Sequence, residues 1–299
     1  MATTQLSLQK TQRVTGQRTY GQFAQIWRRF KRDKAALLGG LIILLTVGCA
    51  IFAPLIAPAD PLQQEAAARL QPIGSPGHLL GTDTNGRDIL SRLIFGSRVA
   101  LQVSLIPVLI SGTLGLALGL LAGFYGGWVD TIIMRLADIM FAFPAILLAI
   151  AIVSALGPNQ LNAILALTVV FIPAFARLVR SQVLSLREQD FVLAARSIGV
   201  WNRAIIFRHI LINTLPVCIV FATLQTGQMI IFAAALSFLG LGVQPPTPDW
   251  GAMANEGRNA MLAAPWVTTI PGIAIFVVTM GFNLLGDGLR DALDPRMKV

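Results

Sequence analysis

Side chains that commonly carry out catalysis are sparse in this chain of 299 residues. None of its lysines stands in the GxxxxGK[ST] pattern that cradles nucleotide phosphates. His78 and His209 are its two histidines, too few for a histidine-rich catalytic zinc site, and neither HExxH nor GxSxG occurs. The sequence therefore predicts a protein that is not an enzyme and that holds no metal or nucleotide cofactor of its own.

Acidic and basic residues alternate at helical spacing between residues 81 and 98. They are Asp83, Arg87, Asp88 and Arg92. On a helix, Asp88 and Arg92 are four positions apart, so their side chains can form an ion pair. The segment is either a surface helix whose charges satisfy one another or a surface that contacts another protein. The sequence leaves both interpretations open.

A second charged segment, residues 177–210, holds six arginines against Glu188 and Asp190, a net charge of +4. Several of its apolar residues can share one helical face: Phe191, Val192, Ala195 and Ile198. Gly199 then permits a sharp change of direction that a Cβ atom would penalise. We expect two short helices joined at this glycine, forming a knob that a partner's groove could enclose. An amphipathic loop resting on phospholipid headgroups is the alternative.

The rest of the chain must place these segments in a membrane. Hydrophobic residues make up 55% of it and charged residues 12%, against about 25% charged in soluble domains. The stretches without charge that are long enough to cross a bilayer are 35–59, 99–129, 139–176, 209–248 and 259–286. Gly157-Pro158-Asn159-Gln160 divides the third stretch into helices near 132–156 and 161–177. We therefore predict an all-α polytopic membrane protein with six transmembrane helices.

The distribution of lysine and arginine orients these helices. With the N-terminus in the cytoplasm, 18 of the basic residues lie inside and 5 outside, which favours both termini inside. Residues 26–32 alternate apolar and basic side chains and are expected to form an amphipathic helix on membrane lipid rather than an arm that binds nucleic acid. The predicted division is a cytoplasmic segment 1–34, a first helix with its extracytoplasmic loop 35–98, a five-helix core 99–286 and a cytoplasmic tail 287–299.

Four separated segments resemble one transport family. The spacing of Ala194-Ala195 and Gly199, followed by His209-Ile210-Leu211, is similar to the EAA loop of bacterial ABC importer permeases, with Leu193 where that loop usually has glutamate and Ile212 where it usually has proline. Residues 81–93, 237–251 and 283–295 resemble further signatures of C-type permeases in the dipeptide, oligopeptide, glutathione and nickel importer family.

The resemblance implies a type I ABC importer permease fold in the bacterial cytoplasmic (inner) membrane. It also implies four kinds of partner: a second, B-type permease subunit, two ABC ATPase subunits that bind ATP and Mg, an extracytoplasmic solute-binding protein, and membrane lipid. It assigns coupling to the ATPase to Leu193, Ala194, Ala195, Arg196, Gly199 and Arg203. Peptides, glutathione and nickel complexes are not distinguished as the solute.

Further expectations concern docking, transport and packing. Extracytoplasmic docking or gate residues are expected to be Asp83, Arg87, Asp88, Arg92, Pro245, Pro246 and Trp250, with the Trp250 ring at the membrane interface. The loop 243–251 could equally form an outer re-entrant cap. A polar cluster could line the translocation path or join neighbouring helices: Thr223, Gln225, Thr226 and Gln228. Arg135 and Asp138 could form an interfacial ion pair. Gly115, Gly119 and Gly123 are expected to pack against a helix of this chain or across a permease pair.

One rival function comes from another class of protein, an autonomous secondary transporter of the inner membrane. Such a transporter would be expected to carry functional carboxylates within its spans and often an internal repeat. The sequence offers Asp138 as a single candidate acid, near the edge of a span. Dependence of uptake on ATP rather than on an ion gradient would separate the two functions.

Overall fold

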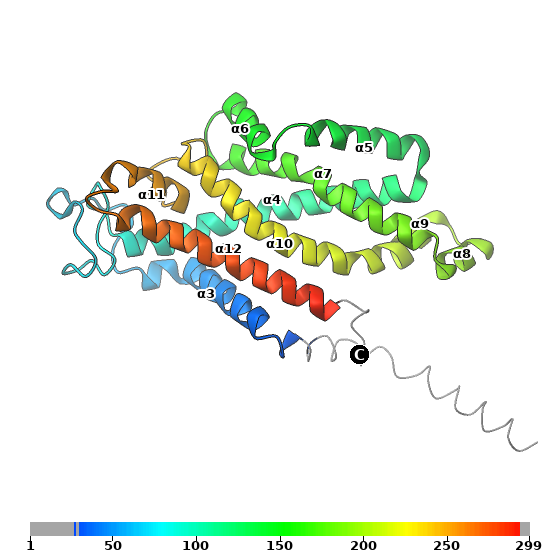
Figure 1. Cartoon of the computed structure of the whole chain (residues 1–299), viewed down its shortest axis with the longest axis horizontal. Coiled ribbons are helices and arrows are strands. Elements are labelled where there is room, and N and C mark those ends of the chain that lie inside the picture. The colour runs from blue at the N-terminus through cyan, green and yellow to red at the C-terminus, as the bar shows by residue number, and fades with distance from the viewer. Residues whose placement is uncertain (1–26, 28–29, 294–299) are drawn as a thin grey trace, which may run out of the picture.

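The computed structural model describes Trp27 and residues 30–293, so Ile26, Arg28 and Arg29 of the amphipathic segment expected at 26–32 lie outside these residues. Within them the named elements are helices (Figure 1). They are α3 (Lys34–Ile56), α4 (Ile89–Tyr125), α5 (Gly127–Phe141), α6 (Ala145–Leu156), α7 (Gln160–Arg187), α8 (Asp190–Ser197), α9 (Asn202–Ile205), α10 (Leu211–Phe238), α11 (Trp250–Glu256) and α12 (Trp266–Leu293). A π-helical turn, Ile206–Ile210, joins α9 to α10, and two 3₁₀ turns lie at Ala66–Ala68 and Arg258–Ala260.

In the described part of the chain, five helical stretches are long and apolar enough to cross a membrane: α3, α4, α7, α9 continued into α10, and α12. The predicted all-α polytopic architecture is confirmed. The single helix predicted near 132–156 is wrong, because α5 and α6 meet at an angle of 89°. Pro144 has no N–H, and its ring disfavours the helical conformation at Phe143, so the helix ends before this pair. The bent pair counts as a sixth crossing only if both helices together make one span.

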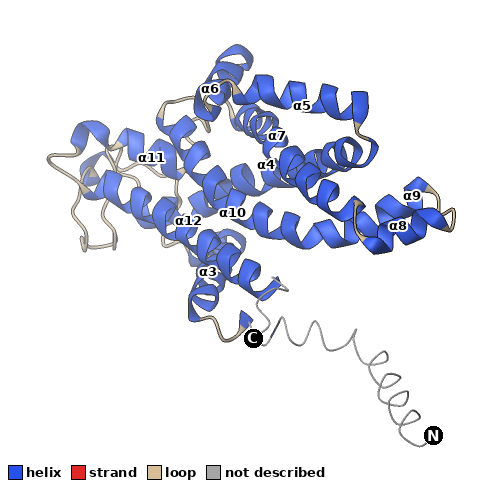
Figure 2. Cartoon of the chain, turned by 45° about the vertical axis from the view of Figure 1, so that its right-hand side comes forward, coloured by secondary structure: helices blue, strands red, loops and turns tan. Residues whose placement is uncertain are grey.

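The two ends of the bundle differ in what they carry. The long loop between α3 and α4 lies with α11 at one end, and α8 and α9 lie at the opposite end (Figures 1 and 2). We call these the α11 end and the α8 end. Helices α3 and α12 are packed antiparallel, since a Cβ atom at Gly288, near the end of α12, would lie 2.2 Å from the Cβ of Ala36 at the start of α3.

The most extensive packing in the core joins α4 to α7. A Cβ atom added at Gly115 would lie 2.3 Å from the Cβ of Phe175, and one at Gly119 would lie 2.5 Å from the Cβ of Val179. The next turn repeats the pattern, with Gly123 against Val183 at 2.6 Å. Small residues one turn apart let two helix backbones approach closely. Packing of these glycines within the chain is therefore confirmed.

Candidate functional site

The α8 end carries a compact projection formed by residues 188–210, which we call the knob. Helix α8 ends in a Schellman motif, in which Val200 N–H donates to the Ala195 carbonyl at 3.0 Å and Gly199 N–H donates to Arg196 at 3.0 Å. Gly199 has φ +80°, a left-handed conformation that a side chain would strain. The predicted change of direction at this glycine is confirmed, and it turns the chain from α8 into α9.

The inner face of the knob is apolar and packs onto the ends of α4 and α7. Val192, Ala195, Ile205 and Ile210 are buried in one cluster with Leu120, Phe124, Val179 and Val183. The predicted common apolar face is only partly correct. Val192 and Ala195 face the core, whereas Ile198 is 81% exposed because the chain has already begun its turn there.

The outer face of the knob combines exposed apolar side chains with positive charge. Its large apolar residues are Phe191, Leu193, Ile198, Trp201 and Phe207. Leu193, Ala194, Arg196 and Arg203 of the expected coupling set are exposed, while Ala195 faces inward. The Arg196 guanidinium lies 5.1 Å from the centre of the Phe124 ring, within reach of a cation–π contact. Exposed tryptophan and arginine are the residues most enriched at the energetic centre of protein interfaces.

Ion pairs hold α5 against α7 close to the knob. Arg180 donates to both carboxylate oxygens of Asp130, with Nη2 2.6 Å from Oδ2. Arg177 Nη2 lies 2.7 Å from Asp138 Oδ1. The ion pair predicted between Arg135 and Asp138 is therefore wrong, because Asp138 is paired with a residue of the neighbouring helix.

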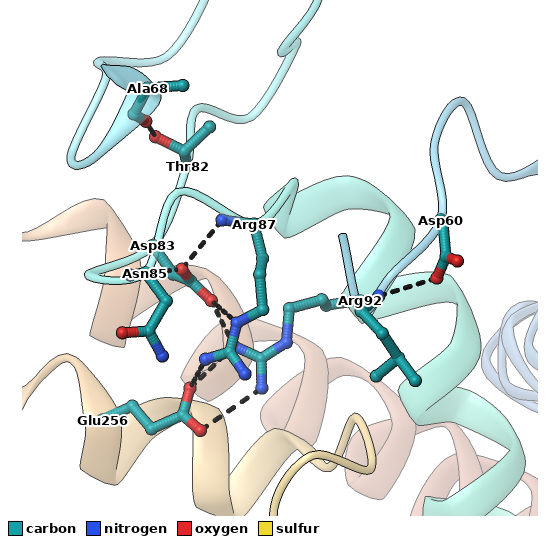
Figure 3. Close-up of polar contacts among 9 residues, drawn as sticks. Asp60, Ala68, Thr82, Asp83, Asn85, Arg87, Arg92 and Glu256 are labelled. Carbon is teal, nitrogen blue, oxygen red and sulfur yellow. Dashed lines mark hydrogen bonds and ion pairs between the residues drawn. The ribbon is translucent and has the colours of Figure 1, made fainter. Parts of the chain in front are cut away.

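The α11 end holds a buried ionic cluster that we call the charge knot: Asp83, Arg87, Arg92 and Glu256 (Figure 3). Arg87 Nε donates to Asp83 at 2.7 Å and Arg87 Nη2 to Glu256 at 2.5 Å. Arg92 donates to the same two carboxylates, at 2.7 Å for Glu256. The two arginine side chains are 2% and 1% exposed. Two positive and two negative charges therefore pair with one another, three of them on buried side chains and the fourth on the partly exposed Glu256.

Asp88 has a separate structural role from the charge knot. It is the N-cap of α4, and its carboxylate accepts hydrogen bonds from the backbone N–H and the hydroxyl of Ser91, at 2.7 and 2.8 Å. Its other oxygen lies 3.0 Å from His78 Nδ1. The predicted ion pair between Asp88 and Arg92 is wrong, because a residue at the N-cap turns its side chain back toward the first backbone N–H groups.

The loop before α4 is closed by glycines that could not carry a side chain. At Gly86, φ is +76° and a Cβ atom would lie 2.0 Å from the Glu65 carbonyl oxygen. At Gly81, φ is also +76° and a Cβ atom would lie 2.4 Å from the Gln71 oxygen. Thr82 donates its hydroxyl to the Ala68 carbonyl (Figure 3). The motif that begins at Gly81 therefore folds the loop onto itself and delivers its charges inward.

Sequence reasoning did not single out Glu256. The available signal was its isolation, since it is the one acidic residue between Trp250 and Gly286. Arg87 and Arg92 share one nearby carboxylate, Asp83, since Asp88 caps α4, so a second carboxylate had to come from elsewhere. Glu256 supplies one of them from the last residue of α11.

The remaining residues expected to dock a partner divide into exposed and buried. Pro245 and Pro246 are exposed. Trp250 is 4% exposed, and its indole N–H donates to the Leu93 carbonyl at 3.0 Å, so the interfacial position predicted for its ring is wrong. Asp249 caps α11 by accepting from Ala252 N–H at 2.9 Å. Burial raises the pKa of this carboxyl above its ordinary value, although its hydrogen bonds act in the opposite direction.

The polar cluster of α10 does not form a single lining surface. Gln225 and Thr226 are buried, whereas Gln228 is exposed and Thr223 is half-buried. The hydroxyl of Thr223 bonds to the Ile219 carbonyl at 2.9 Å, and that of Thr226 bonds to the Ala222 carbonyl at 2.8 Å. Both hydroxyls are thus satisfied by their own helix. A role for these residues in the translocation path stays a prediction.

Most of the chain matches known families of membrane transport proteins. Residues 115–299 match the family model of the binding-protein-dependent transport system inner membrane component, and residues 21–72 match that of the N-terminal TM domain of oligopeptide transport permease C. The chain is 48% identical to the glutathione transport system permease protein GsiD of Pectobacterium atrosepticum, over 92% of this chain and 91% of that protein. It is 49% identical to the dipeptide transport system permease protein DppC of Alkalihalophilus pseudofirmus, over 92% and 90%.

A solved structure shares the fold at lower identity. The inward-facing MetNI methionine ABC transporter aligns with a TM-score of 0.54 and 20% identity, over 68% of this chain and 97% of the matched chain. At that identity the likeness concerns the fold alone.

Proposed function

This chain belongs to the family of binding-protein-dependent transport system inner membrane components, and on this premise we propose that it is a permease subunit for peptides or a related small solute such as glutathione. Relatives named as glutathione and dipeptide permeases, each about half identical to this chain, support that choice of solute. The chain would form part of the translocation path in the bacterial inner membrane, with the polar cluster of α10 as its candidate lining.

We propose further that the knob couples this path to ATP hydrolysis on a separate ATPase, which would bind both ATP and Mg. The observation that carries this proposal is the division of the knob into two faces. Its buried face is continuous with the ends of α4 and α7, and its outer face presents Trp201, Ile198 and arginine side chains. A partner that grips the outer face would therefore move the transmembrane helices rather than a loose loop.

This role places the α8 end and both chain termini in the cytoplasm and the α11 end outside, in agreement with the excess of basic residues predicted inside. A solute-binding protein would then meet the exposed Pro245–Pro246 turn, and a second permease subunit would complete the path. The charge knot and Asp88 would contribute by holding α11 and its loop in place, since their side chains are already paired within the chain.

The test compares two glycines that have almost the same backbone conformation at opposite ends of the bundle. Gly199 has φ +80° and Gly240 has φ +77°, and a Cβ atom at either would meet nothing within 4 Å. A β-branched residue should strain both sites by about 1–2 kcal/mol. We expect Gly199→Val to lose the ATPase during purification of the complex and to abolish ATP-dependent uptake, whereas Gly240→Val keeps the ATPase bound. Gly199→Asn should restore coupling, because asparagine tolerates this conformation.

Equal retention of the ATPase by both valine variants would contradict the coupling role. Uptake by the purified chain in vesicles, driven by an ion gradient without ATP, would replace the proposal with the secondary transporter.

A further inference from the structure

An apolar groove of ≈ 370 Å³ runs between α3, α4 and α12, and the buried Trp250 is one of the residues that line it. The residues that shape it include Ile42, Cys49, Ile94, Ser97, Ala274 and Val278. None of the residues lining it is charged. The groove is a separate feature from both the knob and the charge knot.

The few polar atoms along the groove are already bonded within the protein. Thr46 donates its hydroxyl to the Ile42 carbonyl at 2.8 Å, and Ser97 donates to Ile94 at 2.6 Å. The indole N–H of Trp250 donates to Leu93. A buried water needs two to four polar partners, and this groove offers it none that are free among these groups. The groove therefore suits an apolar occupant.

The surface around the groove is apolar enough to face lipid tails. Its walls α3 and α12 are both membrane-length apolar helices. Leu44 and Leu45 on α3 are 68% and 60% exposed, and Ile273 and Phe276 on α12 are 54% and 65% exposed. In a bilayer, the material that borders such a surface is hydrocarbon.

A cation lies at one end of the groove. Pro54 has no N–H, so the Ala50 carbonyl lacks its usual helical donor, and Arg98 Nε donates to that oxygen instead. Arg98 Nη2 donates to Ile51 at 3.1 Å. Ala50 and Arg98 directly follow Cys49 and Ser97, two residues that line the groove. Among the described residues, no carboxylate lies within 4.0 Å of this guanidinium.

Arg98 is also placed at the level of a lipid headgroup. It is the last charged residue before the apolar stretch 99–129, and it bonds to Ala50 and Ile51 in the last two turns of α3, which ends at Ile56. The side chain is thus held by two backbone carbonyls, keeps further N–H groups, and lacks an acidic partner in the part of the chain described. Arginine binds phosphate oxygens through such N–H groups.

We propose that this groove is a phospholipid site, in which one acyl chain lies along α3 and α12 and the lipid phosphate is bound by Arg98. The site offers both features that a phospholipid needs: an apolar groove for the acyl chain and, at its interfacial end, a cation for the phosphate. It does not depend on the direction of transport or on the identity of the solute.

The test uses the intact transporter complex in vesicles that contain phosphatidylglycerol with a photoactivatable diazirine on its acyl chain. After illumination, mass spectrometry of peptides should locate the cross-links on groove residues such as Cys49 and Ala274. Ala274→Phe, which fills the groove, should remove these cross-links. Ala117→Phe is the matched control, because Ala117 is exposed on α4 and does not line the groove.

The headgroup contact is tested separately. Arg98→Gln keeps a donor for the Ala50 carbonyl but removes the charge, and it should lower cross-linking at the groove about fivefold. Arg98→Lys should retain most of it. Cross-links no denser in the groove than on the exposed faces of α3, or unchanged in both Ala274→Phe and Arg98→Gln, would overturn the proposal. A disulfide or cross-link from Cys49 to the second permease would likewise overturn it in favour of a helix of that subunit.

Discussion

Arg87 Nη2 and Glu256 Oε2 lie 2.5 Å apart and join positions separated by 169 residues in the sequence. The contact ties the loop before α4 to the end of α11. Arg92, one turn into α4, donates to the same carboxylate. Three segments thus meet at one side chain, and the α11 end behaves as a single folded unit rather than as a set of independent loops.

Removal of Glu256 should leave two buried arginines with one carboxylate between them. Breaking a buried ion pair from one side costs about 3–5 kcal/mol. We expect Glu256→Ala to lower the thermal unfolding temperature of the purified complex markedly. Glu65→Ala, which removes an exposed carboxylate from the same end, should not. Equal unfolding temperatures for the two variants would show that the charge knot contributes little to stability.

Asp249 should make stability depend on pH in a direction opposite to that of most carboxylates. Burial raises its pKa in the folded protein above the ordinary 3.8, so folding favours the protonated form. The stabilisation is present below the unfolded pKa and is lost as pH rises through the folded pKa. Asp249→Asn keeps the cap of α11 but cannot ionise. As the pH rises from 4, the unfolding temperature of the variant should increase relative to that of the wild type. A constant difference between the two unfolding temperatures across this pH range would contradict the prediction.

Trp201 should be an anchor of the interface with the ATPase. Truncation of a tryptophan at an interface centre commonly costs about 2 kcal/mol or more, which weakens binding roughly 30-fold. We expect Trp201→Ala to lose the ATPase while its unfolding temperature stays the same, since the ring is 83% exposed. Trp128 on α5 is 82% exposed and gives a matched control. If Trp128→Ala weakens ATPase binding as much as Trp201→Ala, the anchor is not specific.

Gly119 should not tolerate a larger residue. Its added Cβ atom would lie 2.5 Å from the Cβ of Val179, and overpacking of this kind costs about 1–3 kcal/mol. We expect Gly119→Leu to lower the unfolding temperature. Gly48→Leu on α3 meets nothing within 4 Å and should be neutral. Unfolding of the two variants in detergent would measure the difference, and equal effects would exclude close packing as the cause.

The length of the apolar stretches predicted most of the spans. Lipid offers the backbone no hydrogen-bond partners, so a helical segment that crosses it must satisfy its polar groups within the helix. The corner at Pro144 was missed for a physical reason. Pro54, Pro107, Pro173, Pro216 and Pro271 all lie inside continuous helices. Proline in an apolar stretch therefore does not by itself tell where a helix stops.

The candidate site was predicted unevenly. Gly199 was recognisable, because a turn between two short helices needs a left-handed residue and glycine adopts that conformation at the least cost. The partners of Arg87 and Arg92 were recognisable only in part. Helical spacing suggested Asp88 for Arg92, but Asp88 caps α4. Both arginines pair with Asp83 in the same segment and with Glu256, which tertiary folding brings in. The local sequence pattern therefore predicts which interactions a residue can form, and the tertiary fold decides which partner it contacts.

The glycine contacts between α4 and α7 restrict how the protein can change shape. With backbone against side chain at Gly115, Gly119 and Gly123, any axial slip would drive the bulkier α4 residues between them into α7. The two helices should therefore tilt together as one rigid body. A displacement of the knob would then move the opposite end of the α4–α7 pair as well, because the two helices do not slide against each other.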